Sequence, residues 1–277
     1  MTSLANGANT DEMPSASTGF VRPIFTIHPK LEVNEGIFAR LDHAIRAELV
    51  RLGNEASTEE SIALTGFFHW ALENLDPDAY AYIQNRFIAP YVGRDTPSSS
   101  GSPTSKFLNF TYYVKSKMPQ IHRLGLHKCP PKRILDIGCG PGHFQLLAKY
   151  FGHDAIGIDV PLEQDDLFNV LCEYFSVRKL DHRIQPMQCL PDLGMFDFAT
   201  IFLAQFDFDK DKRPWDVNFW HYFVEHISTD LLKADGVLYL TLTSRKRPPE
   251  VWDYLESVAE WTHNSRAVLI RSTRPMA

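Results

Sequence analysis

Three glycines at alternate positions, Gly138, Gly140 and Gly142, follow a short apolar run that contains one acidic residue, Asp136. Glycine adopts backbone angles that other residues avoid, so Gly138 lets the chain turn sharply out of a strand. Gly140 and Gly142 carry no side chain, so a ligand can come close to the backbone and to the start of the next helix. The spacing therefore predicts a loop that holds a ligand against the backbone.

A second acidic residue, Asp159, ends the next apolar run, "DAIGIDV". A carboxylate at the end of the neighbouring parallel strand faces the same ligand and can accept hydrogen bonds from both hydroxyls of a ribose. We therefore predict a nucleoside ligand. Dinucleotide-binding loops have the spacing G-x-G-x-x-G, whereas here the third glycine comes one residue early and His143 occupies the dinucleotide position. This spacing argues against NAD.

The stretch "LDIGCGPG" resembles the first motif of class I S-adenosylmethionine-dependent methyltransferases, D-x-G-x-G-x-G. The stretch "IGIDV" is similar to that family's second strand with its acidic residue, and "FDFATI" to its fourth-strand motif. "LLKADGVLYL" resembles the family's turn into the fifth strand, with Ala234 and Asp235 in place of proline and glycine. The resemblance covers about residues 130 to 245. It implies an α/β fold with a Rossmann-like, doubly wound, mostly parallel sheet, and S-adenosylmethionine as the cofactor.

Carried over position by position, the resemblance also implies which residues contact the cofactor. The methionine part of the cofactor would pass over the backbone of the glycine loop, Asp136 would hold the amino end of that part, and Asp159 would bind the ribose. Residues after the third strand would lie near the adenine, and residues at the end of the fourth strand would face the transferred methyl. The implied set is Asp136, Gly138, Cys139, Gly140, Gly142, Asp159, Val160, Gln188, Cys189, Leu203, Ala204 and Gln205.

Methyl transfer needs mainly the alignment of acceptor, methyl and sulfur, and it needs a base only when the acceptor arrives protonated. We take His143 and Asp207 as the catalytic candidates. His143 begins a predicted helix, where the helix dipole favours the neutral imidazole, which could act as a base or simply cap the helix and pack. Asp207 follows the fourth strand, as does Asp209. His221 and Glu225 are four residues apart and share a helix face. Three interpretations are open: a base held in orientation by a carboxylate, two metal ligands, or an ordinary solvated pair. We expect no metal.

The N-terminal half must help to position these residues, and it reads as helical. Residues 1–20 are small and polar and are predicted to form a disordered tail, whereas residues 21–125 are predicted to form a helical cap over the acceptor pocket. One helix is expected from Asn34 to Gly53, a second from a capping box of Ser57 and Glu60, and a third after Pro77. Their expected apolar faces comprise Ile37, Leu41, Ile45, Leu49, Ile62, Phe67, Trp70, Tyr80, Ile83 and Phe87.

A serine-, proline- and glycine-rich tract, Gly93–Ser105, follows these helices and is either a plain spacer or a mobile lid over the site. The next segment contains Phe107, Phe110, Tyr112 and Tyr113 and reads as one or two helices. Because it directly precedes the first strand, it can reach back over the cofactor cleft. We predict that Tyr112 or Tyr113 contacts the cofactor or the adjoining cavity; the alternative is that these rings only pack against the other helices.

Residues 126–277 alternate between strands and helices and are predicted to form the methyltransferase core. The expected strands are "RILDIG", "DAIGIDV", "HRIQPMQ", "FDFATIFLAQF", "GVLYLTLT" and "AVLIRS". The chain after Thr243 has room for one helix and one strand, rather than the helix and two strands that are usual in the family. Expected helices follow the glycine loop and include "QDDLFNVLCEYFSV", "WDVNFWHYFVEHISTDLL" and "EVWDYLESVAEW".

Composition narrows the function further. The 277-residue chain is 44% hydrophobic, enough for a sizeable core, and its net charge of −6 argues against a nucleic-acid partner. The one basic cluster, "SRKRPP" at Ser244–Pro249, is predicted to be a solvated loop. No apolar stretch is long enough to span a membrane, no signal peptide is recognisable and no cysteines form a C-x-x-C pair, so a reduced, cytoplasmic protein is expected.

We therefore predict a methyltransferase that acts on an oxygen or nitrogen of a small molecule, such as a sugar or a secondary metabolite. The alternatives are a methyltransferase that acts on protein or RNA, and a non-catalytic protein that kept the cofactor-binding fold. The intact glycine motif with Asp159 argues against the non-catalytic alternative. The sequence leaves the acceptor and the oligomeric state open.

Overall fold

The structure is a computed structural model that describes residues 39–88, 104–161, 166–203, 206–208, 213–243, 247–263 and 266–273. The predicted tail at 1–20 lies outside the described residues, as do the expected start of the first helix at Asn34 and its apolar residue Ile37. Almost all of the Gly93–Ser105 tract also lies outside them, so its role as a spacer or lid stays a prediction.

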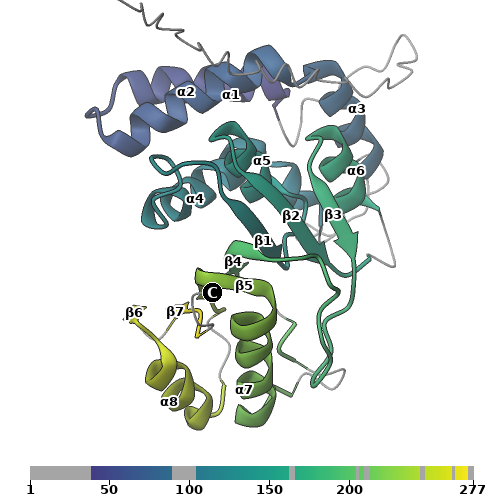
Figure 1. Ribbon diagram of the computed structural model, residues 1–277. Helices are drawn as coiled ribbons and strands as arrows, with labels where there is room; N and C mark the ends of the chain where they lie inside the picture. The colour runs from purple at the N-terminus through teal and green to yellow at the C-terminus, as the bar shows by residue number, and fades with distance from the viewer. Residues whose placement is uncertain are drawn as a thin grey trace, which may run out of the picture.

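A seven-stranded sheet in the order β3-β2-β1-β4-β5-β7-β6 forms the centre of the molecule (Figure 1). The parallel strands are β1 (Arg133–Ile137), β2 (Asp154–Asp159), β3 (Arg178–Asp181), β4 (Phe196–Phe202) and β5 (Leu232–Thr241). β7 (Ala267–Arg271) runs antiparallel to both β5 and β6 (Trp261–His263). The strand order reverses between β1 and β4, which is where a doubly wound sheet opens a crevice at its carboxyl edge. The predicted fold class is confirmed.

Two predictions about the strands are wrong. The chain after Thr243 forms a helix and two strands, and β6 went unrecognised because its three residues are exposed and show no apolar alternation. The third strand was expected at 182–188 but lies at Arg178–Asp181, whereas 182–188 forms no strand. β3 lies at the edge of the sheet, where polar residues such as Arg178 and Lys179 are common and conceal the strand.

Helices cover both faces of the sheet (Figure 1). α5 (His143–Tyr150) and α6 (Leu167–Tyr174) pack on one face, and α7 (Val217–His226) and α8 (Pro249–Val258) on the other. Successive strand residues serve opposite faces, since Ile134 belongs to the core under α5 and Leu135 to the core under α7. α7 was expected to run to Leu232, but its α-helical hydrogen bonding ends at His226 and a π-helical turn, Ile227–Leu231, leads into β5.

Four N-terminal helices cover the same face of the sheet as α5 and α6 (Figure 1). They are α1 (Leu41–Gly53), α2 (Glu59–Asn74), α3 (Pro77–Ile88) and, after a 3-10 turn at Ser105–Leu108, α4 (Phe110–Arg123). The first three lie over α5 and α6, and the last lies beside α5, where Arg123 contacts Tyr239 of β5. The capping box of α2 consists of Thr58 and Ser61 rather than Ser57 and Glu60, because Thr58 is the residue whose side chain accepts from the third helical amide. None of the helices in the described ranges is long and apolar enough to cross a membrane.

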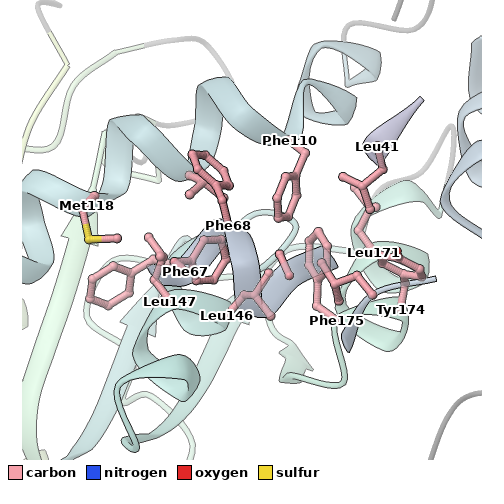
Figure 2. Close-up of a cluster of buried hydrophobic side chains, with 14 of the residues drawn as sticks. Leu41, Phe67, Phe68, Phe110, Met118, Leu146, Leu147, Leu171, Tyr174 and Phe175 are labelled. Atoms are coloured by element: carbon pink, nitrogen blue, oxygen red, sulfur yellow. The ribbon is translucent and has the colours of Figure 1, made fainter. Parts of the chain in front are cut away.

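The N-terminal helices and the core share one hydrophobic cluster (Figure 2). Phe67 of α2 is fully buried, with its ring centroid 6.1 Å from that of Phe110 in α4 and 5.3 Å from that of Tyr150 in α5. Ile62 was expected on the buried face of α2, but 62% of it is exposed. Figure 2 shows the cluster's side chains meeting between the helices, with Leu41, Phe67, Phe68, Phe110, Met118, Leu146, Leu147, Leu171, Tyr174 and Phe175 labelled.

Candidate active site

The glycine loop turns out of β1 and meets the end of β2. Gly138 has a φ of 72° and donates its amide hydrogen to the carbonyl of Ile158 over 2.7 Å. Gly140 has a φ of 55° and donates to the carboxylate of Asp159 over 2.6 Å, and Val160 donates to the other oxygen over 2.7 Å. The sequence-predicted loop and acidic residue thus lie directly together.

The glycines of the motif differ in what surrounds them. A Cβ atom at Gly140 would meet only the Phe168 ring, at the ordinary contact distance of 3.9 Å, so space for a ligand remains there. At Gly142, with a φ of 82°, a Cβ would lie 2.7 Å from a methyl carbon of Val177 and 3.2 Å from the sulfur of Cys172. Left-handed backbone and close packing therefore each require glycine at position 142, and the approach of a ligand to Gly142 stays a prediction.

Cys139 packs inward from the same loop. Its side chain lies against Gly157 of β2, where an added Cβ would come within 2.7 Å of the Cys139 Cβ. Burial raises the pKa of this thiol well above its usual value, so the side chain stays neutral. Cys139 can thus serve the predicted cofactor site through its backbone, while its side chain contributes packing between the loop and β2.

Asp136 of β1 is buried beside its register partner, Thr200 of β4, where the strand order of the sheet reverses. Thr200 of β4 donates its hydroxyl hydrogen to the Asp136 carboxylate over 3.0 Å. Burial raises the pKa of Asp136 to about 7, while the positive charge of Lys117 and the Thr200 hydrogen bond act in the opposite direction. A cation that binds beside this carboxyl would lower its pKa and so favour its ionised form.

Lys117 of α4 approaches Asp136 from the N-terminal helices, closely enough for the two charges to interact. Its side chain is half-buried, with the Nζ atom 4.6 Å from the centroid of the Phe202 ring at the end of β4. Burial lowers the pKa of Lys117, and the negative charge of Asp136 partly restores it. Sequence reasoning missed this residue, because a lysine on an amphipathic helix ordinarily reads as solvent-exposed.

His143, predicted as a catalytic base, begins α5 and is buried among aromatic rings. Its ring stacks on Tyr113 of α4 at 5.3 Å and lies 5.3 Å from Phe175. Burial, followed by the charge of Lys117, lowers the pKa of His143 to about 3. The imidazole is neutral, as predicted, but burial rather than the helix dipole is the main cause. Tyr113 is thereby placed next to the glycine loop, whereas Tyr112 is 58% exposed.

Asp207, the other predicted catalytic residue, forms a buried ion pair. Its carboxylate accepts from the Nε of Arg247 over 2.5 Å, and both side chains are almost completely buried. Arg247 belongs to the "SRKRPP" cluster, so the prediction that this cluster is simply solvated is wrong at Arg247. Asp209 lies outside the described residues, and the His221–Glu225 pair is well exposed on α7.

Further predicted contacts lie after β3 and β4. Gln188 and Cys189 are exposed, and the Cys189 sulfur is 3.1 Å from the hydroxyl of Tyr222. Leu203 has a φ of 58° and is 58% exposed; Ala204 and Gln205 lie outside the described residues. Met187 has the same unusual combination, with a φ of 57° and 52% exposure, and sequence reasoning missed it. Strained backbone of this kind is concentrated at functional sites.

A cavity of about 780 Å³ opens beside Leu203 at the carboxyl ends of β4 and β5. α4 forms one wall, and the turn between β6 and β7 forms another. Several of its polar groups were not singled out from the sequence, because they come from segments far apart in the chain. The lining residues are Gln120, Arg123, Leu203, Thr241, Leu242, Thr243, His263, Arg266 and Ala267.

Comparison with known sequences connects this geometry to one family. The family described as "Methyltransferase domain" matches residues 110–263, more than half of the chain. No curated protein sequence matches.

Several solved structures of methyltransferases also match, each at 16% sequence identity. A TehB-like SAM-dependent methyltransferase from Corynebacterium glutamicum aligns over 58% of this chain and 96% of its own, with a TM-score of 0.36. A ribosomal protein L11 methylase from Lactobacillus delbrueckii aligns over 55% and 76%, with a TM-score of 0.37. A T. thermophilus 16S rRNA N2 G1207 methyltransferase, in complex with AdoMet and guanosine, aligns over 65% and 44%, with a TM-score of 0.35.

Proposed function

This chain belongs to the methyltransferase-domain family and is an S-adenosylmethionine-dependent methyltransferase, and from this premise we propose that its acceptor is a small molecule. The observation that carries the proposal is the cavity beside Leu203, at the carboxyl edge of the sheet. Its volume of about 780 Å³ is within the range of roughly 300–1,000 Å³ that is typical of small-molecule sites. We propose that an oxygen or nitrogen of the acceptor receives the methyl group there.

The residues around the glycine loop fit the cofactor. The space above Gly140 leaves its backbone accessible, and Asp159 offers a carboxylate for the ribose hydroxyls. Asp136 would hold the amino group of the methionine part, and Lys117 would balance its carboxylate. These assignments agree with the electrostatics of the two residues. Burial raises the pKa of Asp136 and lowers that of Lys117, so it disfavours the charged form of each. The zwitterionic methionine part would favour both charged forms, its amino group beside Asp136 and its carboxylate beside Lys117.

We further propose that the remaining predicted contacts line the other parts of the cofactor site. Met187, Gln188 and Cys189 follow β3 and would lie near the adenine, with the exposed thioether of Met187 available to pack on its face. Leu203 would face the methyl. Tyr113 would contact the site through its position beside His143 and the loop.

The chemistry places little demand on a base. S-adenosylmethionine supplies a methyl group bonded to a positively charged sulfur. When the methyl is transferred, the sulfur leaves as a neutral thioether and needs no proton. Alignment of the acceptor can then contribute roughly 7–11 kcal/mol to lowering the barrier. A His143 imidazole with a pKa of about 3 is too weak to take a proton near neutral pH, and Asp207 is held by Arg247. We propose that both residues support the site structurally instead of acting as bases.

We also keep the prediction that this enzyme works in a reducing, cytoplasmic environment. The four cysteines, Cys129, Cys139, Cys172 and Cys189, are all free thiols. Disulfides are rare in such compartments, so the free thiols support the proposal.

The proposal is tested first by calorimetry with S-adenosylmethionine, S-adenosylhomocysteine and NAD. We expect both methyl-donor forms to bind and NAD to give no signal. Radiolabelled methyl transfer is then measured on pools of small molecules, on total RNA and on total protein. Label found only in RNA or protein would refute the small-molecule acceptor, and binding of NAD alone would refute the cofactor site.

A further inference from the structure

We propose that the acceptor is an anion, whose carboxylate or phosphate group is bound by Arg123 and Arg266 in the cavity beside Leu203. This inference rests on the proposed function and narrows its substrate class. The guanidinium of arginine matches both anions because it can donate two parallel hydrogen bonds to a pair of oxygens.

The charge of the cavity differs from that of the chain as a whole. The chain carries a net charge of −6, but the described residues that line the cavity include two arginines and one histidine, and none of them is a carboxylate. A cavity with low-dielectric walls concentrates the potential of the charges that line it. This cavity therefore attracts anions although the protein is acidic.

Arg123 is held in position by neutral partners. Its Nη1 donates to the hydroxyl of Tyr239 over 2.7 Å, and that hydroxyl in turn donates to the side-chain oxygen of Gln120 over 3.1 Å. The guanidinium carbon also lies 5.8 Å from the ring centroid of Trp261 in β6. These contacts orient the group without neutralising it, and within the described residues no carboxylate pairs with Arg123.

Arg266 faces the cavity from the turn that joins β6 to β7. Its backbone is fixed, because its amide donates to the carbonyl of His263 over 3.1 Å and its carbonyl accepts from Leu242 over 2.7 Å. Its side chain is exposed, and no ion pair involves it in the described part of the chain. Arg123 and Arg266 thus present uncompensated charges from two different walls of one cavity.

Other arginines of the core have partners. Arg271, on the strand that follows Arg266, pairs with Glu260 over 2.9 Å, and Arg247 pairs with Asp207 over 2.5 Å. The two cavity arginines differ from these, because no carboxylate of the described ranges pairs with them. A ligand anion would supply the missing charge, and the other end of the ligand would then extend toward Leu203.

The test uses matched pairs of ligands that differ in one charge. Full-length protein saturated with S-adenosylhomocysteine is titrated with 4-hydroxybenzoate against 4-hydroxybenzamide, and with glucose 6-phosphate against glucose. We expect at least one anion to bind about tenfold or more tightly than its neutral partner, and this preference to weaken with added salt. The two pairs distinguish a carboxylate from a phosphate.

Variants assign the preference to the two arginines. Arg123→Gln and Arg266→Gln should each remove most of it, while the affinity for S-adenosylhomocysteine stays unchanged. Arg271→Gln is the matched control, because it removes a nearby arginine that already has a partner, and it should keep the preference. The proposal is overturned if the neutral ligands bind as tightly as the anions, or if neither anion binds. It is also overturned if the preference for the anion survives both cavity substitutions.

Failure of the anion proposal is distinguishable from failure of the proposed function. Each titration is repeated without S-adenosylhomocysteine, so the anion preference is measured even if the cofactor site is misassigned. If the wild-type protein does not bind S-adenosylhomocysteine, the proposed cofactor site is refuted but the anion proposal is not. A short RNA that binds more tightly than both small anions, through the same arginines, would overturn the small-molecule acceptor.

Discussion

The backbone amide of Gly140 donates a hydrogen bond of 2.6 Å to the carboxylate of Asp159, and so joins the glycine loop to the end of β2. Val160 donates to the second carboxylate oxygen. The Asp159 side chain is therefore already oriented at the carboxyl edge of the sheet. In the proposed role, such an oriented carboxylate would lose little side-chain entropy on binding the ribose, which would favour tight binding of the cofactor.

Replacement of Asp159 with alanine should weaken S-adenosylmethionine binding at least tenfold. Two charge-assisted hydrogen bonds to the ribose would be lost, each worth roughly 1.5–3 kcal/mol. Calorimetry measures the effect. Asp181→Ala is the matched control, since Asp181 is the neighbour of Asp159 in the register of β2 and β3 and is exposed. Equal cofactor affinity in Asp159→Ala and wild type would remove Asp159 from the site.

Replacement of Lys117 with methionine should also weaken cofactor binding by about tenfold, because a charge-assisted bond to the methionine carboxylate contributes roughly 1.5–3 kcal/mol. The Met side chain is similar in length to Lys and can pack on the Phe202 ring, over which the Lys117 Nζ lies at 4.6 Å, but it carries no charge. Lys115→Met on the same helix is the control, because Lys115 pairs with Glu48 over 2.8 Å. If both variants bind the cofactor equally well, Lys117 does not act at this site.

The Asp136 carboxyl should make the protein less stable as the pH rises. Its pKa is about 7 in the folded protein against a usual value of 3.8, so folding keeps a proton that the unfolded chain releases. Its contribution to stability is complete below about pH 4 and is lost as the pH rises through about 7. Between these limits, each rise of one pH unit lowers the free energy of unfolding by roughly 1.4 kcal/mol. Asp136→Asn keeps an acceptor for Thr200 but cannot ionise.

Urea denaturation of wild type and Asp136→Asn at about pH 5 and about pH 8 checks this prediction. The variant should gain stability relative to the wild type at the higher pH. A difference in the free energy of unfolding that does not change with pH would show that Asp136 ionises normally in the folded protein.

Replacement of Gly142 with alanine should destabilise the fold more than the same replacement at Gly152. Both residues have left-handed backbone, with φ of 82° and 85°. Strain at such a position costs more than about 1 kcal/mol. Only at Gly142 would the new methyl also collide with Val177, at 2.7 Å, whereas the space at Gly152 is open. Thermal denaturation compares the two, and equal losses would show that packing at Gly142 is looser than the structure indicates.

The N-terminal helices should be inseparable from the core. Phe67→Ala on α2 is expected to cost about 3–5 kcal/mol of stability, because it empties a fully buried site between α2, α4 and α5. Ile62→Ala on the same helix should cost little, since 62% of Ile62 is exposed. Chemical denaturation measures both. A small effect of Phe67→Ala would indicate that the helical layer is only loosely attached.

The sequence by itself determined the family, the glycine loop beside Asp159 and most of the parallel sheet. These features are local: a buried strand, a turn that needs glycine and the start of a helix follow one another within a dozen or so residues. Gly138, Gly140 and Asp159 could be placed because the end of one parallel strand lies beside the end of the next. Edge strands such as β3 and β6 were misplaced or missed, because polar residues dominate them and leave no apolar alternation to recognise.

Only the tertiary structure decided which side chains from distant segments share one environment. Lys117 lies near Asp136 because α4 packs on α5, and Arg123 and Arg266 line one cavity because β6 and β7 fold back beside β5. The burial of His143 among aromatic rings and the pairing of Asp207 with Arg247 arise in the same way. Such contacts depend on how whole elements pack, and the periodicity of a single segment records only which of its own faces is buried.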